Sequence, residues 1–84
     1  MTKNQFKALI ENKFGKDCYK AVCLTERTIK DVIHYEWVIV CKITNVVEAL
    51  FCATDTCIYQ IKYISSTTPA NTLYELDQEL RLSK

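Results

Sequence analysis

Cysteine is the residue type in this chain whose spacing could hold a metal ion. Four of the five cysteines form two close pairs, Cys18/Cys23 and Cys52/Cys57. Zinc ligands that are neighbours in sequence are usually about two to four residues apart on a tight turn. Cys18 and Cys23 lie in an expected strand, where residues five apart point to opposite faces, so these two cannot share one ion. Cys52 and Cys57 flank an expected turn, which leaves a disulfide or a shared ion open there. Free, buried thiols are the expectation for the set.

His34 is the only histidine and the natural candidate for acid–base chemistry near neutral pH. Such a site needs a partner, but no Ser or Cys can be placed beside His34 from the sequence, and Glu36 is its neighbour on the same strand face. We expect a solvated surface histidine. Acidic residues near the C-terminus lie in the first turns of an expected helix, where they favour its dipole. The sequence therefore predicts no catalytic residues, no metal site and no enzyme.

Composition excludes several further classes of function. The single glycine rules out a glycine-rich phosphate loop, so no nucleotide cofactor is expected. Eleven Lys and Arg against ten Asp and Glu give a net charge of +1, too little to steer the protein to nucleic acid or to an anionic membrane. Five lysines do fall within residues 1–20, interrupted by Glu11 and Asp17, and we interpret them as a solvated helix: Lys3, Lys7, Lys13, Lys16 and Lys20.

Length and hydropathy predict one domain, residues 1–84, with a core but without a deep ligand cavity. No segment approaches the roughly 18 apolar residues of a membrane span, and no apolar run follows a basic N-terminus. Together with the odd number of cysteines, this predicts a cytoplasmic protein that does not enter a membrane.

A long strand at about residues 30–43 is the clearest structural signal. Its apolar residues alternate with polar ones, as in a strand that has one face in a core. The expected core face carries Ile29, Ile33, Tyr35, Trp37, Ile39, Cys41 and Ile43.

Two helices and three further strands complete the expected order. A helix at 2–15 has capping-box spacing at Thr2/Gln5 and ends at Gly15, and a last helix opens at 71–72 with a second capping box at Thr72/Glu75. Strands are expected at 18–25 and 57–64, with a polar connection at 26–28 and a loop at 65–69. Residues 46–53 fit either a strand or a short helix, and the flanking turn signals favour the strand. The fold class is therefore α+β: a helix, a four-stranded antiparallel meander sheet and a C-terminal helix, in two layers.

In such a fold both helices cover one sheet face and leave the opposite face open. That face would present aliphatic side chains among polar ones, a mixture that dimers and partner proteins use. Tyr59 and Tyr63 can lie on either face, because the register of the last strand is undetermined. The candidate partner-binding residues are Val38, Val40, Ile58, Glu36, Lys42, Tyr59, Lys62 and Tyr63.

The function expected from this elimination is a small, non-catalytic protein-binding module. Chains of this size and type often act as stoichiometric regulators or inhibitors, including those that viruses and mobile elements carry. The partner is expected to be another protein of unspecified identity, or a second copy of the chain through the open sheet face. The alternative is a nucleic-acid-binding module that uses the Lys-rich first helix and the sheet tyrosines, although nucleic acid is the less expected partner.

Overall fold

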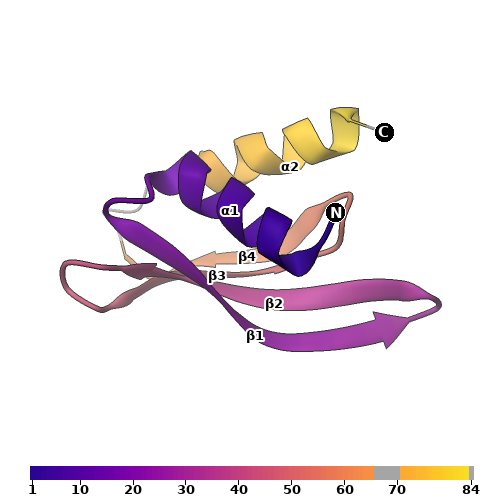
Figure 1. The fold of residues 1–84 in the computed structure, drawn as a ribbon, viewed down its shortest axis with the longest axis horizontal. Coiled ribbons are helices and arrows are strands. Elements are labelled where there is room, and N and C mark those ends of the chain that lie inside the picture. The colour runs from indigo at the N-terminus through magenta and orange to yellow at the C-terminus, as the bar shows by residue number, and fades with distance from the viewer. Residues whose placement is uncertain (66–70, 84) are drawn as a thin grey trace.

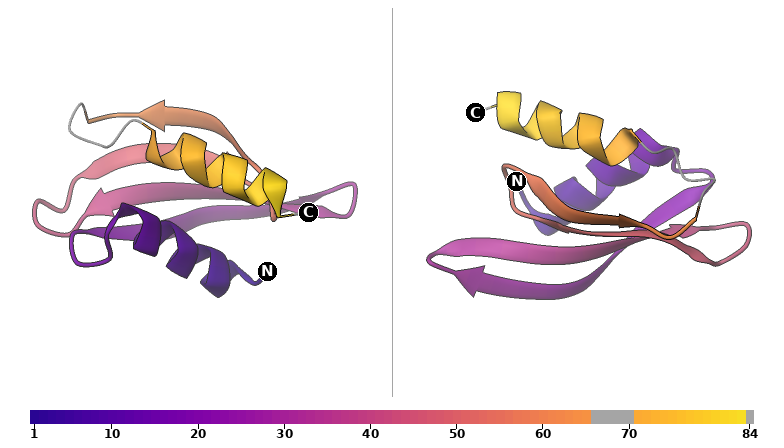
Figure 2. Two further views of the ribbon diagram at one scale, coloured as in Figure 1. Left: turned by 90° about the horizontal axis from the view of Figure 1, so that it is seen from above. Right: turned by 180° about the vertical axis from the view of Figure 1, so that it is seen from behind.

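A computed structural model of the chain describes residues 1–65 and 71–83. Four antiparallel strands form one sheet in the order β1-β2-β3-β4, and both helices lie on the same side of it (Figures 1 and 2). The α+β class and the element order predicted from the sequence are thereby confirmed. The elements are α1 (Lys3–Phe14), β1 (Tyr19–Ile29), β2 (Val32–Cys41), β3 (Val47–Ala53), β4 (Ile58–Tyr63) and α2 (Thr72–Leu82).

Residues 46–53, which the sequence left between strand and helix, are mainly strand β3. The turn before β3 has the expected conformation, because Asn45 adopts a positive φ of 58°. The predicted loop at 65–69 lies almost wholly outside the described residues. Neither of the helices in the described part of the chain has both the length and the apolar character needed to span a membrane.

Helix α1 begins and ends where its sequence predicts. Thr2 and Gln5 form the complete capping box: the Thr2 hydroxyl accepts from the Gln5 N–H, and the Gln5 side chain accepts from the Thr2 N–H. At the other end Gly15 has a φ of 108° and donates its N–H to the Glu11 carbonyl. The helix buries Phe6, Ile10 and Phe14 against the sheet.

The start of α2 differs from the prediction. The helix begins at Thr72, so Asn71 holds the capping position, and it makes no side-chain cap hydrogen bond. Thr72 is one residue too far along the chain to form the expected capping box with Glu75. The leucine stripe is nevertheless correct, and Leu73, Leu76 and Leu80 are all buried.

The connection between β1 and β2 lies further along the chain than expected. Residues 26–28 continue β1, and the chain reverses over Lys30 and Asp31, with φ values of 50° and 67°. A two-residue turn with both φ values positive matches the right-handed twist of a hairpin. Ile29 therefore belongs to β1, where it pairs with Val32. Figure 1 shows this hairpin end reaching past α1, so no helix covers Ile29 or Ile33, and their expected place in the core is wrong.

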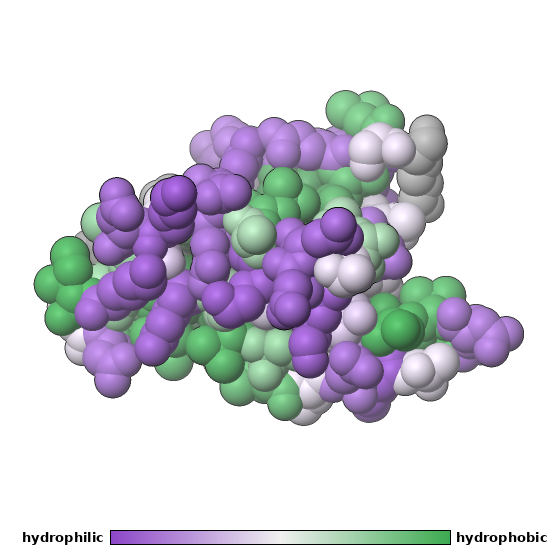
Figure 3. Space-filling model, viewed as in Figure 1, coloured by the Kyte–Doolittle hydropathy of each residue, from purple (hydrophilic) through white to green (hydrophobic). Residues whose placement is uncertain are grey.

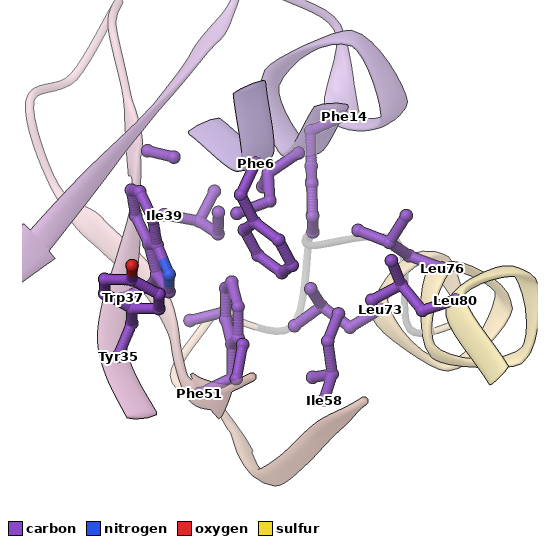
Figure 4. Packing of buried hydrophobic residues seen from close by; sticks show 14 residues of the cluster. Phe6, Phe14, Tyr35, Trp37, Ile39, Phe51, Ile58, Leu73, Leu76 and Leu80 are labelled. Atoms are coloured by element: carbon purple, nitrogen blue, oxygen red, sulfur yellow. The ribbon is translucent and has the colours of Figure 1, made fainter. Parts of the chain in front are cut away.

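One hydrophobic cluster fills the space between the sheet and the two helices. In Figure 4 side chains from β2, β3 and β4 meet those of α1 and α2. Trp37 is fully buried, with its ring stacked on Phe6 at 5.8 Å between centroids, and Tyr35 lies 6.2 Å from it. The largest fully buried side chains are Trp37, Phe6, Phe51, Ile10, Ile39, Leu73 and Leu76.

Glu11 connects α1 to the outer edge of β1. Its Oε2 accepts the Ala21 N–H at 2.9 Å and the Lys7 ammonium at 2.7 Å. Burial alone would raise the pKa of Glu11, but the hydrogen bonds from Lys7 and Ala21, aided by nearby positive charge, outweigh it and lower the pKa below the ordinary 4.5. The carboxylate therefore stabilises the folded state when it is ionised.

Replacing Glu11 with Gln should lower the free energy of unfolding by about 1 kcal/mol at pH 7. The amide oxygen can still accept from Ala21, so the loss reports the charge. Because the folded-state pKa is lowered, this contribution is complete above about pH 4.5 and disappears as the pH falls through the folded-state value. Urea denaturation of wild type and E11Q, followed by circular dichroism, should show a difference that shrinks toward pH 3. A difference independent of pH would contradict the role of the charge, and E75Q, an exposed carboxylate on α2, is the control.

Candidate protein-binding face

The sheet face opposite the helices, here called the open face, is identified by strand register. Residues of each strand that alternate with the core side chains point away from α1 and α2. No element among residues 1–65 and 71–83 covers this face (Figure 2). It carries Lys20, Val22, Leu24, Thr25, Arg27 and Ile29 from β1, Val32, His34, Glu36, Val38 and Val40 from β2, Val47, Leu50 and Cys52 from β3, and Tyr59 and Lys62 from β4.

Val38 and Val40 occupy the expected face but are not exposed. Only 6% and 7% of their surface reaches solvent. Strand β2 lies between two other strands, so neighbours on both sides cover its short valine side chains: Val38 lies between Val22 and Leu50. The expectation that these two valines form the contact surface is therefore wrong, because they lie buried beneath the surface of the open face.

Four exposed apolar side chains of the open face belong to the hairpin of β1 and β2. Four side chains on the open face keep between 38% and 52% of their surface in solvent, and we call this set the apolar stripe: Val22, Leu24, Ile29 and Val32. Figure 3 shows hydrophobic surface along the lower edge of the molecule, below the mainly hydrophilic helices. A bulge contributes to it, because Leu24 is an extra residue between the Cys23/Trp37 and Thr25/Glu36 pairs.

Two of the predicted partner-binding residues lie elsewhere. Ile58 is 3% exposed and belongs to the core cluster, and Tyr63 packs against that cluster. The cause is in β4, where Gln60 takes a φ of 52° beside a register shift. This irregularity breaks the simple alternation, so Ile58, Ile61 and Tyr63 all contact the core. Predictions that put Ile58 and Tyr63 on the binding surface were therefore wrong.

The other predicted residues are placed as follows. Glu36, Tyr59 and Lys62 lie on the open face. Lys42 follows the end of β2, and its ammonium donates to the Lys16 carbonyl at 2.6 Å. Lys42 thus joins the β2–β3 turn to the segment after α1, away from the centre of the face.

A pocket of about 350 Å³ opens on this face near the hairpin end. A side-chain hydrogen bond in the pocket joins β2 to β4: His34 Nδ1 and the Tyr59 hydroxyl lie 2.7 Å apart, with their rings edge to face at 5.9 Å. His34 is half-buried rather than solvated, which corrects the sequence interpretation. Because the partner comes from a strand two positions away in the sheet, no spacing in the sequence could indicate it. The lining residues are Thr25, Arg27, His34, Tyr35, Glu36, Cys52, Tyr59 and Gln60.

The pocket holds a thiol that is unsuited to nucleophilic chemistry. Burial raises the pKa of Cys52, the Glu36 carboxylate raises it further, and Arg27 opposes them only in part. The Cys52 thiol lies 3.4 Å from the Gln60 amide oxygen, to which it donates. Burial also raises the pKa of the Tyr59 hydroxyl, so both groups stay protonated at neutral pH. The protonated Cys52 thiol and Tyr59 hydroxyl are hydrogen-bond donors, and the pocket can bind a ligand without reacting with it.

The cysteines form no other site. All five are free thiols, so Cys52 and Cys57 do not pair. In the described part of the chain there is also no group of three or more His, Cys, Asp or Glu side chains that could hold a metal ion.

Sequence reasoning missed the residues that dominate the open face. Val22 and Leu24 were recognisable as apolar residues facing away from their neighbours, but the bulge beside them hid the strand pattern. The sequence places Arg27 in a connection, because the turn at residues 30–31 lacks the usual Gly or Asn.

Comparison of the chain with protein-family models, curated proteins and solved structures finds no match. Arguments about function therefore depend on the geometry of the chain itself.

Proposed function

We propose that this protein is a small, non-catalytic binding module that contacts another protein through the open face. The supporting observation is the apolar stripe, whose four residues remain exposed on a face that no described element covers. Single exposed aliphatic residues are ordinary on protein surfaces, whereas several on one face mark interaction sites. The surrounding polar residues, Glu36, Tyr59 and Lys62 among them, supply the rim that such interfaces have.

The alternative, a nucleic-acid-binding module, receives less support from the contacts. Three of the five lysines near the N-terminus form ion pairs, Lys3 with Glu26, Lys7 with Glu11 and Lys13 with Glu79. The sheet tyrosines are also committed elsewhere, because Tyr19, Tyr35 and Tyr63 belong to the core or pack against it. Only Tyr59 remains on the open face, and one half-buried ring is a poor platform for stacking bases.

A module of this kind acts by occupying a surface of its partner, as a stoichiometric regulator or inhibitor does. Five free thiols suit a reducing compartment, so we place the protein in the cytoplasm. The size of this chain is also consistent with the small regulators that viruses or mobile elements carry.

The test compares two leucines that differ in position but not in chemistry. Leu24 is 52% exposed on the open face, and Leu82 is 82% exposed on α2. We expect L24E to abolish capture of a stoichiometric partner from the native cell, because a buried, unpaired carboxylate at an interface is costly. Wild type and L82E should capture the same protein, identified by mass spectrometry.

Both variants should keep the wild-type circular dichroism spectrum, since both leucines are on the surface. Equal capture by L24E and wild type would refute the proposed use of the open face. Sedimentation of the purified chain provides the second arm: a dimer that L24E dissociates would identify a second copy as the occupant.

A further inference from the structure

The pocket beside the apolar stripe offers hydrogen-bond donors in excess of acceptors. Arg27 makes no ion pair or hydrogen bond within the described ranges 1–65 and 71–83, although its charge reaches Cys52 and Tyr59. Neutral His34 and Tyr59 bond to each other through Nδ1 and the hydroxyl, so one further N–H or O–H of this pair remains to donate. The Gln60 amide oxygen accepts from Cys52, so the amide nitrogen keeps its two donors. Glu36 is the one carboxylate among the residues that line the pocket.

Two backbone irregularities converge on this pocket. The bulge in β1 places Thr25 opposite Glu36, and the positive φ of Gln60 in β4 brings Tyr59 and Gln60 to the same pocket. The left-handed region is unfavourable for a non-glycine residue, and bulges often re-aim side chains beside binding sites. The two irregularities supply three of the polar residues that line the pocket.

We propose that this pocket binds a carboxylate group of the partner, with Arg27 as the principal donor and His34, Tyr59 and Gln60 around it. The proposal rests on the proposed function and adds the chemistry of the partner: an acidic side chain or chain terminus next to an apolar segment. The charges of the open face agree, because Lys20, Arg27 and Lys62 outnumber Glu36. The guanidinium group of arginine matches a carboxylate in a paired, two-bond geometry.

The experiment uses sodium acetate as the carboxylate probe and follows backbone and side-chain signals of the ¹⁵N-labelled chain by NMR. Sodium chloride at equal ionic strength is the reference. We expect saturable shifts at Thr25, Arg27, His34 and Tyr59, with an affinity on the order of millimolar, as is usual for a small ion. Shifts confined to the lysines of α1, or shifts equal to those with chloride, would overturn the proposal.

Two substitutions with opposite expected effects exclude a purely structural explanation. R27Q should weaken acetate binding by about tenfold, because it removes a charge-assisted bond. E36Q should strengthen binding by roughly threefold, because it removes the one opposing charge. K62Q changes a cation on the same face but outside the pocket and should leave the affinity near the wild-type value. Equal affinities for R27Q and K62Q would overturn the role of Arg27.

Further measurements distinguish a carboxylate from other anions, and they test the pocket separately from the open face. Inorganic phosphate that saturates the pocket while acetate does not would overturn the assignment to a carboxylate. A single-stranded oligonucleotide that shifts the same signals and competes with acetate would overturn the choice of protein over nucleic acid. The L24Q variant removes the apolar side chain without adding a charge beside Thr25, so it should bind acetate like wild type. Loss of acetate binding thus tests the pocket, and loss of partner capture tests the open face.

Discussion

Replacing Trp37 with Ala should lower the free energy of unfolding by about 3 to 5 kcal/mol. The side chain is fully buried between Phe6 and Tyr35, and its removal leaves a cavity that the sheet backbone cannot close. A domain of this size has a total stability of roughly 5 to 10 kcal/mol, so W37A should be marginally folded or unfolded at room temperature. Urea denaturation followed by circular dichroism measures the loss.

Tyr74→Ala is the matched control, because Tyr74 is an aromatic residue with 61% of its surface exposed on α2. Its replacement should cost less than about 1 kcal/mol. The native protein gives an independent check, since Trp37 is its only tryptophan: iodide should quench the fluorescence weakly. Strong quenching, or a stability of W37A equal to that of Y74A, would show that the ring is not in the core.

Asp77→Ala should have the second largest effect, a loss of about 2 to 3 kcal/mol. Asp77 is an 8% exposed carboxylate, and its Oδ1 accepts the Ile58 N–H at 2.8 Å, which fixes the start of β4 to α2. Both carboxylate oxygens also accept from Arg81 Nε at 3.0 Å. Alanine leaves a buried N–H without an acceptor and the arginine without its partner.

Asp77→Asn distinguishes the two contributions, because its amide oxygen can still accept from Ile58 while the charge on Arg81 is unmatched. We expect D77N to lie between wild type and D77A in urea denaturation. Glu75→Ala, an exposed carboxylate on the same helix, is the control and should change stability by less than about 0.5 kcal/mol. A D77A variant no less stable than E75A would contradict the proposed link between α2 and β4.

The fold was largely predictable from the sequence because the signals that define it are local. Alternation around Trp37, the capping box at Thr2 and the leucine stripe of α2 each concern residues within a few positions of one another. The errors arose where one residue breaks a local pattern. Lys30 adopts a positive φ that is unusual for lysine, and the bulge at Leu24 shifts the strand phase, so the sequence pattern predicts two shorter strands in place of the long hairpin.

The candidate site was harder to predict because it is assembled by register across the sheet. His34 and Tyr59 are 25 residues apart and meet only because β3 lies between their strands with one particular alignment. The face of Tyr59 depends in turn on the irregular backbone at Gln60. Val38 and Val40 lie on the expected face, but their burial depends on the position of β2 between two other strands, which a pattern of alternation does not describe.

The hydrogen bond between Glu11 and the Ala21 N–H affects how readily the free protein aggregates at high concentration. β1 is an outer strand, and an outer strand can recruit the strand of another chain and begin aggregation. Glu11 occupies a backbone donor of that edge beside α1, whereas no side chain of the described residues accepts a backbone N–H of residues 27–29 at the hairpin end. This end of the edge includes Ile29 of the apolar stripe. A partner seated there would also shield the edge, so the protein should be more prone to aggregate alone than in its complex.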